Sequence, residues 1–173
     1  MPDARIVVLG GGPAGDVAAL RAAQLGAEVV LVERDLLGGT CVNRGCIPTK
    51  ALLAGSELVS KMREASEWGI RVGEVGVSWQ QMRDRASGIA VKMRGGVEQA
   101  CATRGVRVVR GDGWLVAPDR VAVETAEGVE EVSAPTIVIA TGSEPARLAL
   151  YPTVAEAVMD AARDAHGVGL YAG

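Results

Sequence analysis

Short apolar runs alternate with glycine-rich turns along the first part of the chain. Arg5–Leu9 and Glu28–Val32 are rich in Val, Ile and Leu, as buried parallel strands are. Between them, Asp16–Gly26 is rich in Ala and Leu at the spacing of a helix that packs on a sheet. The order of strand, glycine turn, helix and strand predicts a βαβ unit with a parallel sheet.

The pattern further along predicts two helices, over Ala51–Trp68 and over Ser78–Arg104 with Ser78 as N-cap. Three glycines inside the second helix permit a kink. The other predicted elements are a sheet-extending strand at Val106–Arg110, an antiparallel meander at Trp114–Val116, Arg120–Glu124 and Val129–Ser133, a buried strand at Thr136–Ala140, and a C-terminal helix at Pro152–Ala165. We therefore predict an α/β fold with a parallel sheet, flanking helices, a small antiparallel β-meander and a C-terminal helix.

Composition narrows the class of protein. A chain of 173 residues, 49% of them hydrophobic, is long enough for one domain with a buried core. The net charge of −3 argues against a nucleic-acid partner, and no apolar run has membrane-spanning length. The N-terminus enters a strand directly without a signal peptide, so we expect a cytoplasmic protein. Three cysteines are too few for a disulfide framework.

The turn at residues 10–15, GGGPAG, fits the Gly-x-Gly-x-x-Gly pattern of a dinucleotide-binding turn. Gly10 permits the tight turn, Gly12 lets backbone N–H groups approach a pyrophosphate, and Gly15 allows close packing of helix on strand. Glu33 ends the second strand, where a carboxylate accepts hydrogen bonds from ribose hydroxyls. Glycine turns that bind nothing also occur. The position of this turn between a predicted strand and a predicted helix favours dinucleotide binding.

A second glycine-rich segment, residues 38–50, contains Cys41 and Cys46. In a regular helix, residues five apart are about 140° out of phase and separated by roughly 7.5 Å along the axis. Cα atoms joined by a disulfide lie within about 7 Å, so the pair requires an irregular backbone, which Gly45 and Pro48 permit. Pro48 also predicts a helix beginning near Cys46, and a helix N-terminus favours the thiolate.

Other interpretations of these residues stay open. Two unpaired core cysteines are one alternative to a redox pair. A metal site is another, but we predict none, since the only histidine, His166, is distant in sequence and no second cysteine pair exists. Cys101 fits a small apolar residue on a helix face. Lys50 is either an ordinary exposed lysine or a fixed positive charge that supports a thiolate and a redox cofactor.

Together the turn 10–15 with Glu33, the segment 38–50, and Ala140–Ser143 with Pro145 resemble the flavin-dependent pyridine nucleotide–disulfide oxidoreductases. The string Gly-Gly-Thr-Cys-x-Asn-x-Gly-Cys-Ile-Pro-x-Lys is highly specific to this family. The residues that follow it, 51–53, resemble the dihydrolipoamide dehydrogenase members of that family. The resemblance covers residues 3–148 and implies a Rossmann-like FAD-binding domain.

The resemblance also implies an oxidoreductase chemistry for cell redox homeostasis. Cys46 would be the flavin-side thiolate, and Cys41 the interchange thiol that meets a small dithiol such as dihydrolipoamide. Electrons would pass from the dithiol to the disulfide, then to FAD, and then to NAD. The residues implied to bind FAD are Gly10, Gly12, Gly15, Glu33, Gly39, Thr40, Lys50, Gly113, Thr141, Gly142 and Ser143.

After Pro145 the chain departs from the family pattern. No second glycine fingerprint for NAD follows, and the residues from 149 onward resemble the family's C-terminal segment instead. There Tyr151 stands at the position of the family's catalytic histidine, and Glu156 at that of its acidic catalytic partner. We therefore predict an FAD-binding domain at residues 1–148 and a helical tail at 149–173, without NAD-linked turnover by this chain alone.

Two further functions remain as alternatives. The chain can be a non-catalytic FAD-fold binding or assembly module that dimerises through the apolar face of Pro152–Ala165. It can also be a small thiol–disulfide exchanger that uses Cys41 and Cys46 without flavin. For a redox enzyme, a homodimer or a second chain that supplies the NAD domain would complete the path of the electrons.

Overall fold

The computed structural model describes residues 4–144. The chain divides into two compact units, Met1–Gly142 and Ser143–Gly173, and each is considered by itself. The predicted C-terminal helix, with Tyr151 and Glu156, lies outside the described residues.

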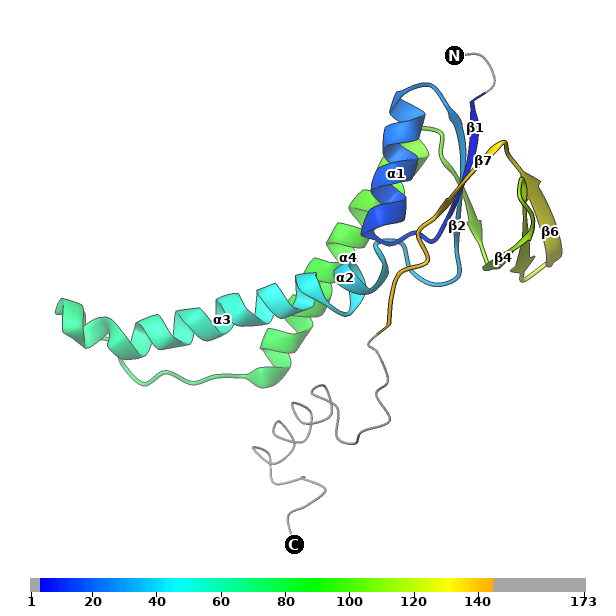
Figure 1. Ribbon diagram of the computed structural model, residues 1–173. Coiled ribbons are helices and arrows are strands. Elements are labelled where there is room, and N and C mark those ends of the chain that lie inside the picture. Colours follow the sequence, from blue (N-terminus) through cyan, green and yellow to red (C-terminus); the bar gives the residue numbers. More distant parts are fainter. Residues whose placement is uncertain (1–3, 145–173) are drawn as a thin grey trace, which may run out of the picture. The chain divides into compact units, whose positions relative to one another are not determined.

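The first unit is built on a four-stranded parallel sheet with the order β3-β2-β1-β7 (Figure 1). Its strands are β1 (Arg5–Leu9), β2 (Glu28–Glu33), β3 (Arg107–Arg110) and β7 (Thr136–Ile139). Helix α1 (Pro13–Gln24) connects β1 to β2, as the predicted βαβ unit requires. The predicted α/β fold, including the extension of the sheet by β3, is confirmed.

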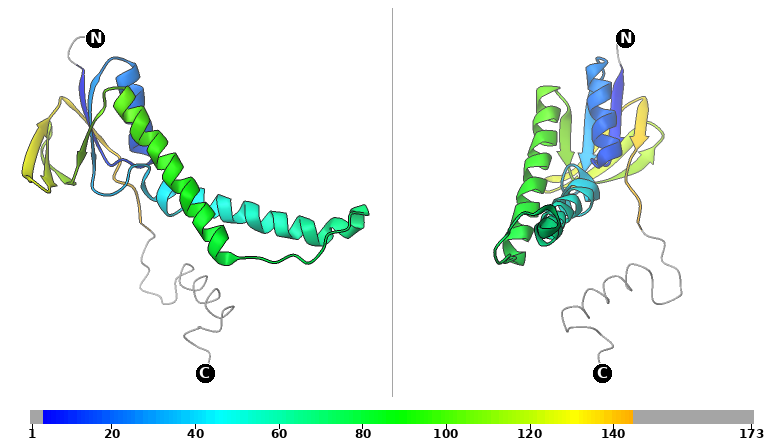
Figure 2. Two further views of the ribbon diagram at one scale, coloured as in Figure 1. Left: turned by 180° about the vertical axis from the view of Figure 1, so that it is seen from behind. Right: turned by 90° about the vertical axis from the view of Figure 1, so that its left-hand side faces the viewer.

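Alternation along the strands divides the core into two layers. Val7 and Leu9 point to the side of the antiparallel meander, where they pack with Val121 and Val123. Val8 points to the opposite side, among residues of the helix layer. Figure 2 shows helices α1 and α4 lying side by side over that second face. The strands read as continuous apolar runs because both faces of the sheet are covered.

The meander consists of β4 (Asp112–Ala117), β5 (Arg120–Thr125) and β6 (Gly128–Ser133), paired antiparallel in that order. This arrangement was predicted. The prediction of a buried strand at Thr136–Ala140 was wrong about burial, although the strand forms. Within the described residues β7 is an edge strand beside β1, and the side chain of Ile139 is 63% exposed.

The helices after β2 begin at one end of the sheet, and the last of them returns over the face that α1 covers. They are α2 (Gly39–Asn43), α3 (Cys46–Glu64), the 3₁₀ turn η1 (Ala65–Trp68) and α4 (Trp79–Thr103). Helix α3 begins at Cys46, as Pro48 in its first turn predicts, and so includes five residues before the apolar pattern that starts at Ala51. Ser78 caps α4 through its Oγ, which accepts from the N–H of Gln81, and α4 is assigned as one continuous helix across its glycines.

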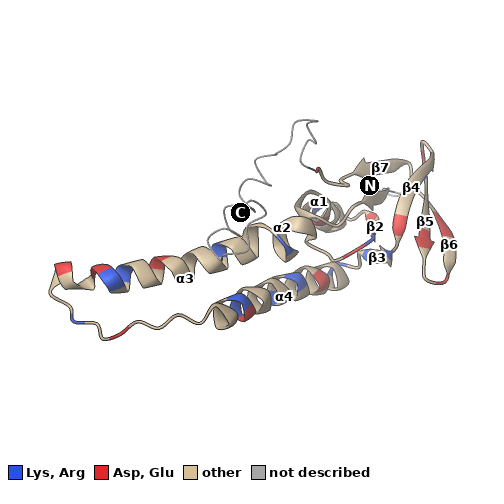
Figure 3. Ribbon diagram, turned by 90° about the horizontal axis from the view of Figure 1, so that it is seen from below, with Lys and Arg blue, Asp and Glu red and all other residues tan. Residues whose placement is uncertain are grey.

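Helices α3 and α4 pack against each other as a long hairpin (Figure 2). Figure 3 shows Lys and Arg interspersed with Asp and Glu along both helices rather than gathered by sign. Within residues 4–144, no helix combines the length and the apolar character that crossing a membrane requires.

Candidate functional site: a glycine turn beside a thiol pair

The glycine turn after β1 is held by close backbone contacts. A methyl group at Gly15 would lie 1.7 Å from the carbonyl oxygen of Gly10, and one at Gly10 would lie 2.3 Å from that of Ala140. Gly10 also has a left-handed φ of 103°. These two positions therefore require glycine for the fold itself.

Gly12 differs from its neighbours in the turn. It caps α1 with an extended backbone and without a side-chain cap, so the first N–H groups of the helix are left for another acceptor. A methyl group at Gly12 would meet nothing closer than the Cα of Gly39, at 3.9 Å. The fold alone therefore does not require glycine at this position.

The carboxylate of Glu33 braces the turn. Its Oε2 accepts a hydrogen bond from the N–H of Gly11 at 2.6 Å, and its Oε1 accepts one from the N–H of Asp35 at 2.7 Å. Sequence reasoning missed these two bonds. A carboxylate has about four acceptor positions, so two bonds leave capacity for the hydroxyl groups of a ligand.

A cleft of about 210 Å³ lies at the carboxyl ends of the parallel strands. Glu33, Gly113 and Thr141 line it together with Gly10. A methyl group at Gly113 would lie 2.6 Å from the side chain of Leu9, so a larger residue would disturb this wall. Ligands of parallel α/β sheets bind at this edge. The fold therefore gathers four of the predicted cofactor residues, from four separate segments, around one cleft.

The second glycine-rich segment turns sharply and docks on the first. Gly38 and Gly39 have left-handed φ values of 84° and 55°. The N–H of Gly38 donates to the carbonyl oxygen of Gly11 at 2.7 Å. A methyl group at Gly39 would lie 2.8 Å from the Cα of Gly12. The beginnings of α1 and α2 therefore lie against each other, and glycine at both positions permits it.

The two cysteines lie on either side of a break between helices. Cys41 is half-buried on α2, and Cys46 is the exposed first residue of α3. Between them the backbone leaves helical geometry at Arg44 (φ −136°, ψ −2°) and Gly45 (φ −126°, ψ −109°). This is the irregular backbone that the sequence requires for a cysteine pair at this spacing. Both thiols are free.

The thiols act on each other. A hydrogen bond with the Cys46 side chain is the largest cause that raises the pKa of Cys41, followed by desolvation and the charge of Cys46. The backbone of Cys46 and the positive charge of Lys50 act in the opposite direction. The balance of these effects raises the pKa of Cys41 above its ordinary value. Lys50 is exposed and its charge reaches the pair.

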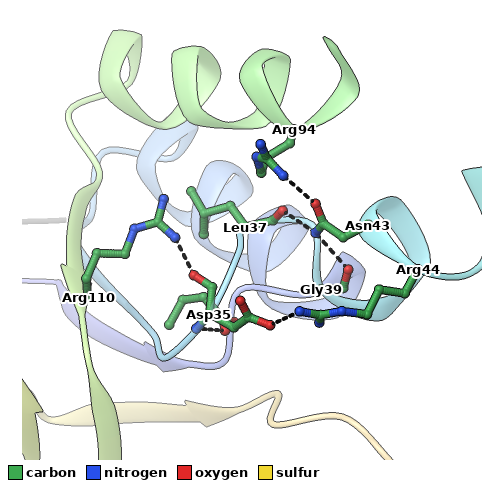
Figure 4. A network of polar contacts seen from close by, with 8 residues as sticks. Asp35, Leu37, Gly39, Asn43, Arg44, Arg94 and Arg110 are labelled. Atoms are coloured by element: carbon green, nitrogen blue, oxygen red, sulfur yellow. Dashed lines mark hydrogen bonds and ion pairs between the residues drawn. The ribbon is translucent and has the colours of Figure 1, made fainter. Parts of the chain in front are cut away.

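A network of polar contacts anchors this segment to the rest of the unit (Figure 4). The side-chain amide of Asn43 donates to the carbonyl oxygens of Leu37 at 3.0 Å and of Gly39 at 2.9 Å, and it accepts from Arg94 of α4 at 3.0 Å. A second anchor runs from Arg110 of β3 to the carbonyl oxygen of Asp35, at 2.6 Å. Sequence reasoning missed both anchors, because their partners are distant along the chain.

The Asp35 side chain pairs with Arg44 at 2.6 Å, and Arg110 pairs with Glu98 of α4 at 2.9 Å. These four side chains are all substantially exposed, so each ion pair adds little stability by itself. Through Arg110, which bonds both Asp35 and Glu98, the loop before α2 is joined to helix α4.

The remaining polar groups of the core are Asp16 and Cys101. Asp16 is 7% exposed, and its Oδ1 has no hydrogen-bond partner among the described residues. Burial is the main cause that raises its pKa. Cys101 is fully buried on α4, as expected for a small core residue, and burial likewise raises its pKa.

Of the predicted site residues, Ser143 belongs to the second unit and Glu156 is outside the described residues, so both stay predictions. Thr40 is exposed on α2 next to Cys41, and Gly142 ends the first unit with a left-handed φ of 88°. Within residues 4–144, no group of three or more His, Cys, Asp or Glu side chains is placed to hold a metal ion.

The parallel sheet, the glycine turn and the adjoining thiols together define a dinucleotide-fold domain that carries a cysteine pair. Comparison with known families agrees: the sequence profile described as pyridine nucleotide-disulphide oxidoreductase matches residues 4–169. The chain belongs to this family.

Its relatives include dihydrolipoyl dehydrogenases from distant organisms. The chain is 45% identical over 144 residues to the enzyme of Manduca sexta, covering 82% of this chain and 29% of that one. It is 36% identical over 157 residues to the enzyme of Bacillus subtilis, covering 90% and 34%. The crystal structure of LpdA from Mycobacterium tuberculosis superposes with a TM-score of 0.76 at 31% identity, covering 83% of this chain and 33% of that chain. The chain thus spans about a third of the length of these relatives.

Proposed function

We propose that this chain is the FAD-binding, disulfide-bearing part of a dihydrolipoyl dehydrogenase-like oxidoreductase. The single observation that carries the proposal is the contact between the two glycine turns, Gly12 against Gly39, with Cys41 two residues beyond. It would bring the thiol pair next to a dinucleotide held on the first helix. The relatives named above support the same chemistry.

The described residues fit FAD. The open first turn of α1 beside Gly12 suits a diphosphate, and the cleft between Glu33 and Gly113 suits the adenosine end. In this proposal Gly10 and Gly15 shape the turn, while Gly39, Thr40 and Lys50 meet the cofactor beside the thiols. Thr141, Gly142 and Ser143 would close the site after β7. When bound, FAD supplies the acceptor for the electron pair that the thiols deliver.

The cysteines perform dithiol–disulfide exchange in this proposal. One thiolate of a small dithiol, such as dihydrolipoamide, attacks the Cys41 sulfur of the oxidised pair and breaks the Cys41–Cys46 bond. The second substrate thiol then displaces Cys41, so the substrate leaves as a disulfide and the pair gains two electrons. In this proposal Cys46 is the thiol that faces the cofactor, and Lys50 supplies a positive charge near the pair.

We propose further that this chain alone does not perform NAD-linked turnover. Its 173 residues contain one glycine fingerprint, and the matched residues cover 29% and 34% of the two dehydrogenases named above. In this proposal another chain, which carries an NAD domain, would supply the NAD site. Glu156, with Tyr151 in the place of a histidine base, is proposed as the remnant of the family's catalytic acid–base pair.

The test is the absorption spectrum of the purified chain after addition of FAD. We expect a protein-bound flavin spectrum and, on addition of a dithiol, a long-wavelength thiolate–flavin band. The Cys46→Ser variant should lack this band, whereas Cys41→Ser should keep it. A chain that binds no FAD even after refolding with it would contradict the proposal.

Two alternatives have their own discriminating outcomes. A non-catalytic module that dimerises through Pro152–Ala165 would lose its dimer when residues 149–173 are removed, as measured by the mass in solution. A flavin-independent thiol exchanger would exchange disulfides in the absence of FAD, and this activity would disappear in Cys46→Ser.

A further inference from the structure

The amide of Asn43 lies between the two cysteines in sequence and has a single allowed orientation. Its NH₂ group faces two carbonyl oxygens, those of Leu37 and Gly39, and carbonyl groups only accept. Its own oxygen faces the guanidinium of Arg94, which only donates. A flipped amide would place acceptor against acceptor and donor against donor. All three partners therefore fix the same geometry.

The two carbonyl groups that Asn43 holds flank Gly38. This residue and Gly39 form the left-handed bend that leads into α2, and the N–H of Gly38 bonds to Gly11 of the glycine turn. Helix α2 has only five residues, too few to be stable by itself. Its position, and with it that of Cys41, therefore depends on the bend and on the amide that closes it.

Arg94 reaches this amide from α4, 51 positions further along the chain. Its guanidinium contacts the oxygen of the amide at 3.0 Å, so we expect its influence on the cysteines to act through the position of that amide.

We propose that Arg94 is a positioning residue for the thiol pair: by holding the Asn43 amide it keeps Cys41 within bonding reach of Cys46 and so favours the disulfide. This inference rests on the proposed redox role of the pair. Forming the disulfide releases two electrons and two protons from the thiols, and a dithiol/disulfide buffer takes up both. Looser cysteines have a lower effective concentration towards each other, so their disulfide forms less readily.

The test is an equilibrium titration of the chain in mixtures of oxidised and reduced dithiothreitol. Alkylation followed by peptide mass spectrometry gives the oxidised fraction of the pair and separates it from the buried Cys101. At the midpoint of the titration half of the cysteine pairs are oxidised. For Arg94→Met we expect the ratio of oxidised to reduced dithiothreitol at this midpoint to be at least about threefold higher than for the parent. Arg94→Lys keeps a donor and should stay within about twofold of the parent.

Three controls keep this inference open to contradiction. Lys92→Met removes an exposed charge from the same helix and should leave the midpoint unchanged. Asn43→Asp keeps the acceptor for Arg94 but loses both donors, and should shift the midpoint in the same direction as Arg94→Met. The double variant should shift no further than Asn43→Asp alone. Circular dichroism identifies any variant that fails to fold, in which case Arg94→Lys and Asn43→Asp carry the comparison.

The outcomes separate this inference from the proposed function. A parent pair that never oxidises in the series would overturn the redox role, and the inference with it. A parent that titrates while Arg94→Met titrates identically would overturn the inference alone. Additive shifts in the double variant would also overturn it, because Arg94 would then act independently of Asn43.

Discussion

At the scale of single residues, the glycines of the turn after β1 serve different purposes. Gly15 has no space for a methyl group, since the carbonyl oxygen of Gly10 lies 1.7 Å from where its Cβ would be. Gly12 has such space, with nothing nearer than 3.9 Å. The pattern of three glycines therefore contains two positions that the fold requires and one, Gly12, at which it leaves space for a methyl group.

This difference gives a prediction with an internal control. Gly12→Ala should fold as the parent does but bind FAD about tenfold or more weakly, because the methyl group would occupy the approach to the helix N-terminus. Gly15→Ala should instead lose stability by about 3 kcal/mol or more, because backbone must move. Flavin fluorescence titration measures the first effect, and urea denaturation the second. If Gly12→Ala and the parent bound FAD equally well, the proposed position of the diphosphate at this turn would be wrong.

Asp16 predicts a pH dependence of stability. Burial raises its pKa in the folded chain above the ordinary value near 3.9, so over the interval between the two values the folded state binds more protons than the unfolded state. The stability contributed by Asp16 is therefore present below about pH 3.9 and is lost as the pH rises through the folded value. Asp16→Asn should remove this loss.

The measurement is the urea midpoint of parent and Asp16→Asn across the acidic range up to pH 7. We expect the urea midpoint of Asp16→Asn to rise relative to that of the parent as the pH rises. Parallel curves would mean that Asp16 does not titrate differently in the folded and unfolded states.

At the scale of elements, helix α4 is weakened by its own sequence. Gly88, Gly95 and Gly96 lie inside it, and a methyl group at any of them would meet nothing within 4 Å. None of the three has a left-handed φ. Packing against α1 and α3, rather than intrinsic propensity, therefore keeps this helix continuous.

Alanine at these positions should stabilise the chain. Gly95→Ala and Gly96→Ala should each raise the free energy of unfolding by about 1 kcal/mol, because alanine loses less backbone entropy in a helix. Urea denaturation measures the gain, and Gly69→Ala is the matched control, since its left-handed φ of 73° should make alanine unfavourable there. A loss of stability in Gly95→Ala would mean that the added methyl group meets a neighbouring group and that the space around Gly95 is not open.

At the scale of the whole molecule, the proposed cofactor site joins segments from the length of the first unit. A ligand that binds only the folded state should therefore stabilise the unit as a whole. FAD at about 100 times its dissociation constant should add about 2.7 kcal/mol, seen as a rise of several degrees in the thermal midpoint. With about tenfold weaker binding, the same addition should stabilise Gly12→Ala by only about 1.4 kcal/mol.

Much of the fold and part of the site follow from local sequence. The strand–turn–helix–strand unit, the meander and the break between Cys41 and Cys46 depend on side-chain alternation, glycine and proline, which act over a few residues. The exposure of β7 was not predicted. An apolar run such as Thr136–Ala140 indicates a strand but not whether the strand lies at the centre or the edge of its sheet.

The sequence by itself determined the βαβ unit, the glycine turn and the thiol pair, because each is specified by neighbours along the chain. Only the tertiary structure decided what surrounds them: Gly39 against Gly12, Glu33 bonded to the turn, and Arg94 on the amide of Asn43. The physical reason is that these contacts join residues 22 to 51 positions apart, and no periodicity records which distant partner a polar side chain will meet.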